Sequence, residues 1–302
     1  ATYQWKEKVA AHLSGNGFSE IFTNSITNSA YYDEETLNQS VRMINSLSSE
    51  LDIMRPQMIQ SGLEVIAHNL NRKNQQLFLY EFGKTYHSDG TGNYSEKQHL
   101  VIFASGNLRE KSWNQSEVKA DFFHLKAIVE NILRLSGIKK YSFESLQNAT
   151  YSNGANLSIG PSTLAVMGVV NPQLLKKFDI KQPVFYADID TGILTGHKTK
   201  PVQYRELSRF PVVNRDLAVL VDKNVSYSQI EQIALSHKIG QLTSVRLFDI
   251  FESEKLGPGK KSMAVSFTFL DENKTLTDKE IDGYMQTIIN GFESKLKAEI
   301  RK

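Results

Sequence analysis

Six consecutive segments in the C-terminal third of this 302-residue chain restrict its fold more than any other feature. They read as strand, helix, strand, strand, helix and strand, and both helices begin with a capping box, Ser226-x-x-Gln229 and Thr277-x-x-Glu280, which satisfies free backbone groups of the first turn. The segments span 216–221, 226–235, 245–251, 263–270, 277–296 and 298–301. This β-α-β-β-α-β order predicts a ferredoxin-like domain, in which two helices cover one face of an antiparallel sheet and leave the other face open.

The strands over 245–251 and 263–270 indicate which side chains lie on the open face. Side chains along a strand point alternately to opposite faces of a sheet. The large residues of the second strand belong together on the helix face, and the same alternation places Phe248 and Ile250 there. The open face is then expected to hold Ala218, Asp249, Phe251, Ser262, Ala264, Ser266 and Thr268.

This expected face combines small residues with one aromatic ring and one carboxylate, a combination that fits a flat base. Single-stranded RNA is read by stacking of bases on aromatic side chains and by hydrogen bonds to base edges, and stacking contributes about 1–3 kcal/mol per base. A carboxylate such as Asp249 only accepts hydrogen bonds, which suits a base edge with N–H donors, such as that of guanine. Two plainer interpretations stay open: Phe251 as a core or interface aromatic, and Asp249 as a solvated charge at a strand end.

The first two-thirds of the chain predict a second domain with a different organisation. Apolar stripes at helical spacing and alternating segments, separated by turn residues, indicate an antiparallel sheet flanked by helices. The expected helices span 2–13, 58–70 and 121–136, and the expected strands span 18–26, 76–86, 99–105, 155–159, 164–170 and 184–189. A stretch without periodicity follows. We therefore expect an α+β chain with domains at 1–194 and 209–302, joined by a linker at 195–208.

The composition excludes several kinds of chemistry. The chain has no cysteine, which removes disulfides, thiol catalysis and cysteine-bound zinc. Its net charge is only +2, so any contact with RNA would come from a local surface rather than from a strongly basic chain. No apolar run approaches the ~18 residues that a membrane span needs, and no secretory signal is visible at the start. We expect a cytoplasmic protein that binds neither membrane nor DNA, and the helical pattern at its first residues is compatible with a fragment of a longer chain.

Familiar catalytic and metal-binding motifs are missing from the sequence. There is no phosphate-binding P-loop, dinucleotide glycine fingerprint, His-Glu-x-x-His or Gly-x-Ser-x-Gly motif. Asp188 and Asp190 share one face of a predicted strand, and paired carboxylates can perform acid–base chemistry. No other catalytic group lies near them in sequence, so we favour a solvated strand end. We predict no catalytic residue and no metal site in this chain.

Four stretches carry a resemblance to a known family. They are residues 45–86, Trp113 followed by 121–133, residues 167–180, and residues 209–222 leading into the strand at 245–251. Together and in this order they resemble the C-terminal part of the bacterial phenylalanyl-tRNA synthetase β subunit, over essentially the whole chain. The resemblance implies a class II synthetase-like, catalytic-like domain of antiparallel sheet and flanking helices, followed by a ferredoxin-fold anticodon-binding domain.

The resemblance also implies an activity and its partners. In that family the β subunit joins a catalytic α subunit in an (αβ)2 assembly, which links phenylalanine to its tRNA with ATP and Mg2+. This chain would support the α subunit and bind phenylalanine tRNA, with ATP and Mg2+ at the α subunit and no cofactor in this part. The open face would read the first anticodon base, a guanine, through Ala218, Asp249, Phe251 and Ser262. Phe251 stands where the family often has tyrosine, so stacking is kept while a phenolic hydrogen bond is lost.

The catalytic-like domain departs from a working class II site. Such a site needs an arginine on its motif 2 strand and another in a glycine-rich motif 3 helix, because guanidinium grips phosphate oxygens in a bidentate manner. Here Tyr86 and His87 occupy the place expected for the first arginine, and no glycine-rich segment with an arginine occurs in the last third of the domain. The residues therefore predict a module that keeps the fold without an active site.

Trp5 and Phe22 lie in the region that resembles motif 1, which forms the interface between subunits in the family. A position in the core is the competing interpretation for both residues. Arg55 and Arg72 could meet acceptor-stem phosphates or partner carboxylates, and a solvated salt bridge is an equal alternative.

The charge of the C-terminal unit limits what it can bind alone. Residues 205–302 carry 15 Lys and Arg against 14 Asp and Glu, so we predict weak RNA affinity for this chain in isolation. Two other functions remain open for the whole chain: a stand-alone amino-acid sensor, and a structural assembly protein without an RNA role.

Overall fold

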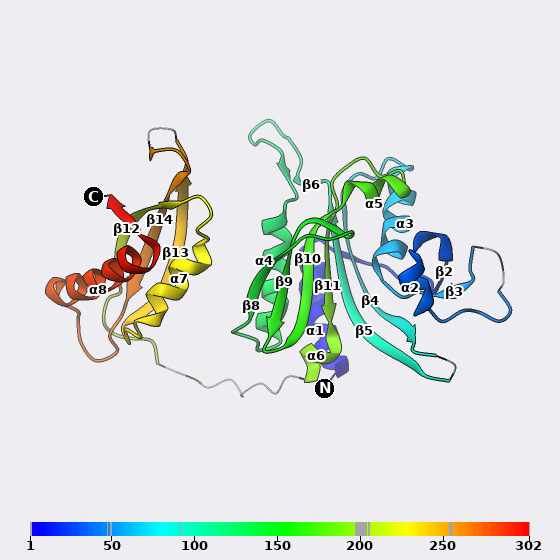
Figure 1. Ribbon diagram of the computed structural model, residues 1–302, viewed down its shortest axis with the longest axis horizontal. Coiled ribbons are helices and arrows are strands. Elements are labelled where there is room, and N and C mark those ends of the chain that lie inside the picture. Colours follow the sequence, from blue (N-terminus) through cyan, green and yellow to red (C-terminus); the bar gives the residue numbers. More distant parts are fainter. Residues whose placement is uncertain are drawn as a thin grey trace. The chain divides into compact units, whose positions relative to one another are not determined.

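The computed structural model describes residues 2–46, 48, 50–90, 92–196, 204, 206–253 and 256–301 (Figure 1). The chain forms two compact units, Ala1–Pro201 and Val202–Lys302, and each is described by itself. Helix α6, Thr191–Gly196, extends two residues into the stretch expected to be a linker, and residues 197–203 and 205 of that stretch lie outside the described residues.

The first unit is built on a seven-stranded sheet with the order β1-β4-β5-β11-β10-β9-β8. Its strands are β1 Ser19–Glu20, β4 Leu77–Ser88, β5 Tyr94–Ser105, β8 Ser142–Leu146, β9 Tyr151–Ile159, β10 Ser162–Val170 and β11 Phe185–Asp190. All neighbours are antiparallel except β1 and β4, which pair in parallel at one edge. The expected antiparallel sheet is thus confirmed in its body, and the sheet as a whole is mixed.

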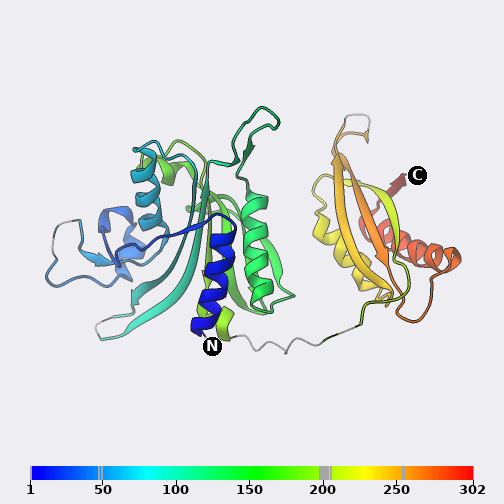
Figure 2. The ribbon, with the colours of Figure 1, turned by 180° about the vertical axis from the view of Figure 1, so that it is seen from behind.

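Helices cover both faces of this sheet. Helices α1, Thr2–Gly15, and α4, Phe122–Leu135, lie side by side on one face (Figure 2), where they share a core with inward residues of the central strands. Helix α3, Ile59–Leu70, and the short helix α5, Pro172–Lys177, pack on the other face in a second core. The apolar stripe predicted for 121–136 is buried, and Asp121 caps α4 by accepting from the backbone N–H of His124 at 2.7 Å.

Short elements connect these layers. They are β2 Ile26–Thr27 paired with β3 Ile53–Met54, the 3-10 helix η1 Ser29–Tyr31, helix α2 Glu34–Asn38, and the hairpin of β6 Asn107–Arg109 and β7 Val118–Lys119. The strand expected over 18–26 is broken into β1 and β2, and Thr23 between them bonds the side chain of Glu81 on β4 rather than the backbone of that strand. Strand β8 was not expected, since four of its five residues are exposed and show no alternation.

The second unit has the predicted ferredoxin-like fold. Its sheet order is β13-β14-β12-β15 with antiparallel neighbours throughout. The elements are β12 Val213–Asp222, α7 Tyr227–Ser236, β13 Leu242–Phe251, β14 Lys260–Phe269, α8 Asp278–Leu296 and β15 Glu299–Arg301. Both capping boxes form, and α7 and α8 pack on one face, so that in Figure 2 the strands lie in front of the helices.

Candidate nucleic-acid interface

The four residues predicted to read a base lie together on the sheet face opposite the helices. Directly opposed residues of antiparallel strands share a face. Ala218 of β12 opposes Ala264 of β14, which opposes Asp249 of β13, so these three form one row across the sheet. In the adjacent row Ser262 lies between Leu220 and Phe251. The structure therefore brings Ala218, Asp249, Phe251 and Ser262 into two neighbouring rows.

A β-bulge in β13 gives this face its arrangement. Leu247 opposes Val265 and Asp249 opposes Ala264, which leaves Phe248 as an extra residue. The prediction that Phe248 packs against the helices is wrong, because this bulged residue is 51% exposed on the outermost strand. Ile250 opposes Met263, on the helix side as expected, but it is 49% exposed and adds little to the core.

The side chains in the two rows differ in solvent exposure. Phe251 is 54% exposed, so it is not a core aromatic and its ring is free to stack. Asp249 is also exposed, and Ala218 and Ala264 form a half-buried floor beside it. Ser262 is only 8% exposed, so it contributes to the floor more than it offers a free hydroxyl.

The first unit contains a polar network on the α3 side of its sheet. His99 Nδ1 lies 2.7 Å from Asp188 Oδ1, and His99 Nε2 lies 2.9 Å from the Thr85 hydroxyl. The Tyr186 hydroxyl donates to Asp188 at 3.2 Å, and burial, with Asp188 nearby, raises the pKa of Tyr186 well above its usual value. The network has the order of a hydroxyl–imidazole–carboxylate triad, but Thr85 is only 2% exposed, whereas the side chains of His99 and Asp188 are 13% and 20% exposed.

Asp188 and Asp190 do not act together. The carboxylate of Asp190 accepts from the backbone N–H of Ile193 at 3.0 Å in α6, whereas Asp188 belongs to the histidine network. Asp188 is therefore a partly buried, bonded group rather than the solvated strand end that the sequence indicated.

Arg55 corrects another expectation. It is 2% exposed, pairs with Glu81 at 3.1 Å, and donates to the Thr23 hydroxyl at 2.6 Å and to the carbonyl of Lys84 at 2.8 Å. This is a buried ion pair, neither a phosphate contact nor a solvated bridge. A side chain at Gly83 would collide with Arg55 and Met58, which shows that this part of the sheet face is filled.

Arg72 differs from Arg55 in being exposed at the end of α3. Its guanidinium donates to the carbonyl of His68 at 3.1 Å.

The two predicted interface residues, Trp5 and Phe22, differ in burial. The indole N–H of Trp5 donates to the Ser136 hydroxyl at 2.8 Å, and its ring meets Phe82 edge-on at 6.0 Å, so Trp5 packs, partly buried, against the core. Phe22 is 95% exposed. The backbone beside it is fixed, because the N–H of Ile21 donates to the carbonyl of Tyr80 at 2.8 Å and Thr23 bonds Glu81.

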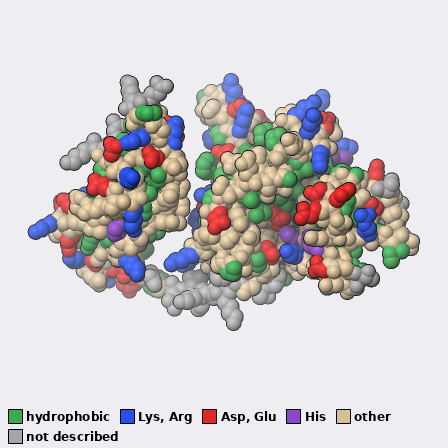
Figure 3. Space-filling view, in the orientation of Figure 1, with side chains coloured by type: hydrophobic (Ala, Val, Ile, Leu, Met, Phe, Trp, Pro, Cys, Tyr) green, Lys and Arg blue, Asp and Glu red, His purple; other side chains and the backbone are tan. Residues whose placement is uncertain are grey.

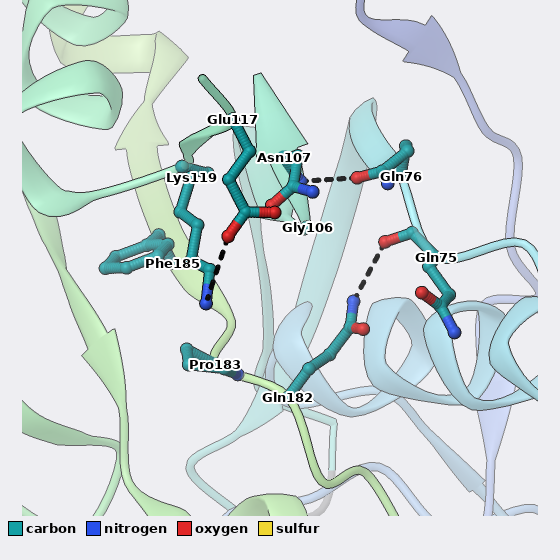
Figure 4. Close-up of a pocket in the computed structure, with 10 residues that line it drawn as sticks. Gln75, Gln76, Gly106, Asn107, Glu117, Lys119, Gln182, Pro183 and Phe185 are labelled. Atoms are coloured by element: carbon teal, nitrogen blue, oxygen red, sulfur yellow. Dashed lines mark hydrogen bonds and ion pairs between the residues drawn. The ribbon is translucent and has the colours of Figure 1, made fainter. Parts of the chain in front are cut away.

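A cavity of about 290 Å³ lies at the base of the β6–β7 hairpin (Figure 4). Its polar groups already bond one another: Gln182 donates to the carbonyl of Gln75 at 3.0 Å, the N–H of Asn107 bonds the Gln76 side chain, and Lys119 lies 4.0 Å from Glu117. None of the residues singled out from the sequence lines it.

Within the described residues, no three His, Asp or Glu side chains gather in a way that could hold a metal ion. No helix in the described part of the chain is long and apolar enough to cross a membrane.

Comparisons with known proteins agree with this architecture. The family model of the phenylalanyl tRNA synthetase beta chain CLM domain matches residues 1–191, and that of the ferredoxin-fold anticodon binding domain matches residues 208–301. Pyrrolysyl-tRNA synthetase from Desulfitobacterium hafniense superposes with a TM-score of 0.50 at 19% identity, covering 64% of this chain and 65% of that one. This likeness, over 64% of the chain, shows the fold of a class II synthetase.

Curated relatives cover both units. The phenylalanine–tRNA ligase β subunit of Bacteroides fragilis is 40% identical over 308 residues, which include 97% of this chain. That of Porphyromonas gingivalis is 37% identical over 314 residues, which include 99% of this chain. The chain spans 38% of the length of these relatives. The two family models match consecutive parts of the chain, and the curated relatives match over both parts. The chain therefore belongs to the phenylalanine–tRNA ligase β-subunit family.

Proposed function

We propose that this chain is the part of a phenylalanine–tRNA ligase β subunit that holds a catalytic α subunit and binds the anticodon of phenylalanine tRNA. The observation that carries the proposal is the row formed by Ala218, Ala264 and Asp249, with Phe251 in the adjacent row. The two alanines offer small side chains beneath a base, Phe251 offers a ring for stacking, and Asp249 accepts N–H bonds. Guanine presents such donors on its Watson–Crick edge.

The first unit supports the other half of the proposal. Its α3-side sheet face holds the buried Arg55–Glu81 pair and the Thr85–His99–Asp188 network, whose polar groups already bond one another. An exposed Phe22 on a fixed backbone suits docking against a partner subunit. We assign catalysis, with ATP and Mg2+, to the α subunit of a cytoplasmic (αβ)2 enzyme.

The test uses the complete ligase assembled from both subunits. Phe251→Ala and Asp249→Asn are each expected to raise the KM for phenylalanine tRNA about tenfold, because each removes one base contact, while the KM values for phenylalanine and ATP stay unchanged. Asp249→Asn also reduces the preference for guanine over adenine at the first anticodon position. Steady-state aminoacylation measures all of these quantities.

Asp282→Asn provides the matched control, since Asp282 is exposed on α8 on the helix side. An unchanged tRNA KM in both test variants would refute anticodon binding and favour a purely structural assembly role. Melting curves of each variant confirm that the domain remains folded.

A further inference from the structure

Arg246 is a basic residue on the open face, one row away from the proposed base site. Arg246 of β13 opposes Ser266 of β14, which opposes Asp216 of β12. This row adjoins the row of Ala218, Ala264 and Asp249, and because Ala264 and Ser266 are two residues apart on one strand, the rows are about 7 Å apart. Arg246 is exposed.

Three other cations near this sheet already have acidic partners. Lys260 pairs with Glu299, Lys223 pairs with Glu252 at 2.8 Å, and Arg215 pairs with Asp278 at 2.6 Å on the helix side. Among the described residues Arg246 makes no ion pair. In the open-face rows through Asn214, Asp216 and Ala218, Arg246 is the one basic residue on β12, β14 and β13, and Arg301 of β15 opposes Ala218.

The acidic groups on this face repel a phosphate, and the positive charge of Arg246 reduces that repulsion. Asp249 and Asp216 both lie on the open side, and residues 205–302 are close to neutral overall, with 15 Lys and Arg against 14 Asp and Glu. A nucleotide whose base meets Asp249 brings a phosphate toward a surface that is locally negative. A free guanidinium one row away offsets this repulsion and can grip phosphate oxygens in a bidentate manner.

We propose that Arg246 binds the RNA backbone at the phosphate next to the base that lies over Ala218 and Ala264. This inference rests on the proposed function of the same face and adds separate roles for its residues. Asp249 and Phe251 select the base, whereas Arg246 positions the chain and supplies affinity that does not depend on sequence.

These separate roles predict how the tRNA KM depends on salt concentration. Each phosphate contact to a single strand contributes about 0.7 to the slope of log affinity against log salt. In the complete ligase, Arg246→Gln should therefore raise the tRNA KM at low salt and reduce its increase between 50 and 200 mM salt by about threefold. Arg246→Lys keeps the charge and should keep the salt slope, and kcat should not change in either variant.

Lys279→Gln is the matched control, because it removes the same charge from an exposed position on α8. With Arg246→Gln the KM should rise by the same factor for tRNAs with guanine and with adenine at the first anticodon position, whereas Asp249→Asn changes their ratio. An unaltered salt slope in Arg246→Gln, with Asp249→Asn still effective, overturns the assignment of Arg246 alone. If neither Arg246→Gln nor Asp249→Asn changes the tRNA KM, the proposal that this face binds RNA is refuted as well.

Discussion

At the scale of the residue, the same side-chain type takes different roles according to its surroundings. Arg55 is buried against Glu81, whereas Arg246 is exposed beside the proposed base site. Trp5 is partly buried against the core and bonds Ser136, whereas Phe22 is 95% exposed. Residue type alone could not separate these cases, because burial depends on which distant segments pack against each side chain.

Phe251 allows a direct test of the missing phenolic group. Phe251→Tyr is expected to lower the KM for phenylalanine tRNA about two- to tenfold, the worth of one hydrogen bond. Stability should not change, because a ring that is 54% exposed leaves room for the hydroxyl. Aminoacylation kinetics and melting curves supply the two measurements. Phe123→Tyr, at another exposed phenylalanine, is the control, and a KM equal to that of the unchanged enzyme would show that no acceptor lies within reach.

The Arg55–Glu81 pair predicts a large effect on stability. Arg55→Met leaves the carboxylate of Glu81 buried without its cation and should lower the free energy of unfolding of the first unit by about 3–5 kcal/mol. Arg72→Met, at an exposed site, should stay within about 0.5 kcal/mol. Urea unfolding followed by circular dichroism measures both, and a loss below about 1 kcal/mol for Arg55→Met would contradict the buried pairing.

At the scale of the element, periodicity predicts what lies inside a strand or helix better than what happens at its edges. The two capping boxes locate the starts of α7 and α8, and the alternation in β14 assigns its faces. The parallel β1, the exposed β8 and the bulge at Phe248 were not predicted. All three lie at sheet edges, where one side of the strand has no neighbour to impose a pattern.

The capping box of α8 predicts a pH effect. Hydrogen bonds from Lys274 and Thr277 lower the pKa of Glu280 from 4.5 to about 2. A depressed folded-state pKa stabilises the fold above the unfolded value, and this contribution is lost as pH falls from about 4.5 toward 2. Glu280→Gln should therefore melt below the unchanged chain at neutral pH, by a modest margin because the site is exposed, and the difference should vanish near pH 2.

Melting curves between pH 7 and pH 2 measure this difference. Asp282→Asn, at an exposed position outside the box, should show no such convergence. A constant gap between Glu280→Gln and the unchanged chain across this range would contradict the assigned cause.

At the scale of the whole molecule, each unit has its own core and its own task. The helices of the second unit pack on one sheet face and leave the other without helices, while helices cover both faces of the first sheet. Acidic and basic side chains are interspersed on the helix side of the second unit, which Figure 3 turns toward the viewer. Such a surface does not attract RNA strongly, so the proposed recognition rests on the few residues of the open face.

This charge balance predicts weak binding by the chain alone. Titration of phenylalanine tRNA at about 150 mM salt should give dissociation constants in the micromolar range or weaker, as is typical of nonspecific contacts. Fluorescence anisotropy with labelled tRNA measures the affinity, and addition of the α subunit should tighten it. Nanomolar binding by the isolated chain would contradict the prediction, since it would require a larger basic surface than this chain provides.

The sequence by itself determined the two-domain α+β organisation, the ferredoxin-like order and the small, aromatic and acidic composition of the open face. These follow from signals spaced two to four residues apart, which depend on local backbone geometry. Tertiary structure alone decided that Arg55 is buried, that Phe22 rather than Trp5 is free, that Ser262 is nearly covered, and that Arg246 stands unpaired among the described residues beside Asp249. Each of these depends on contacts or gaps between segments far apart in the chain, and no local pattern encodes them.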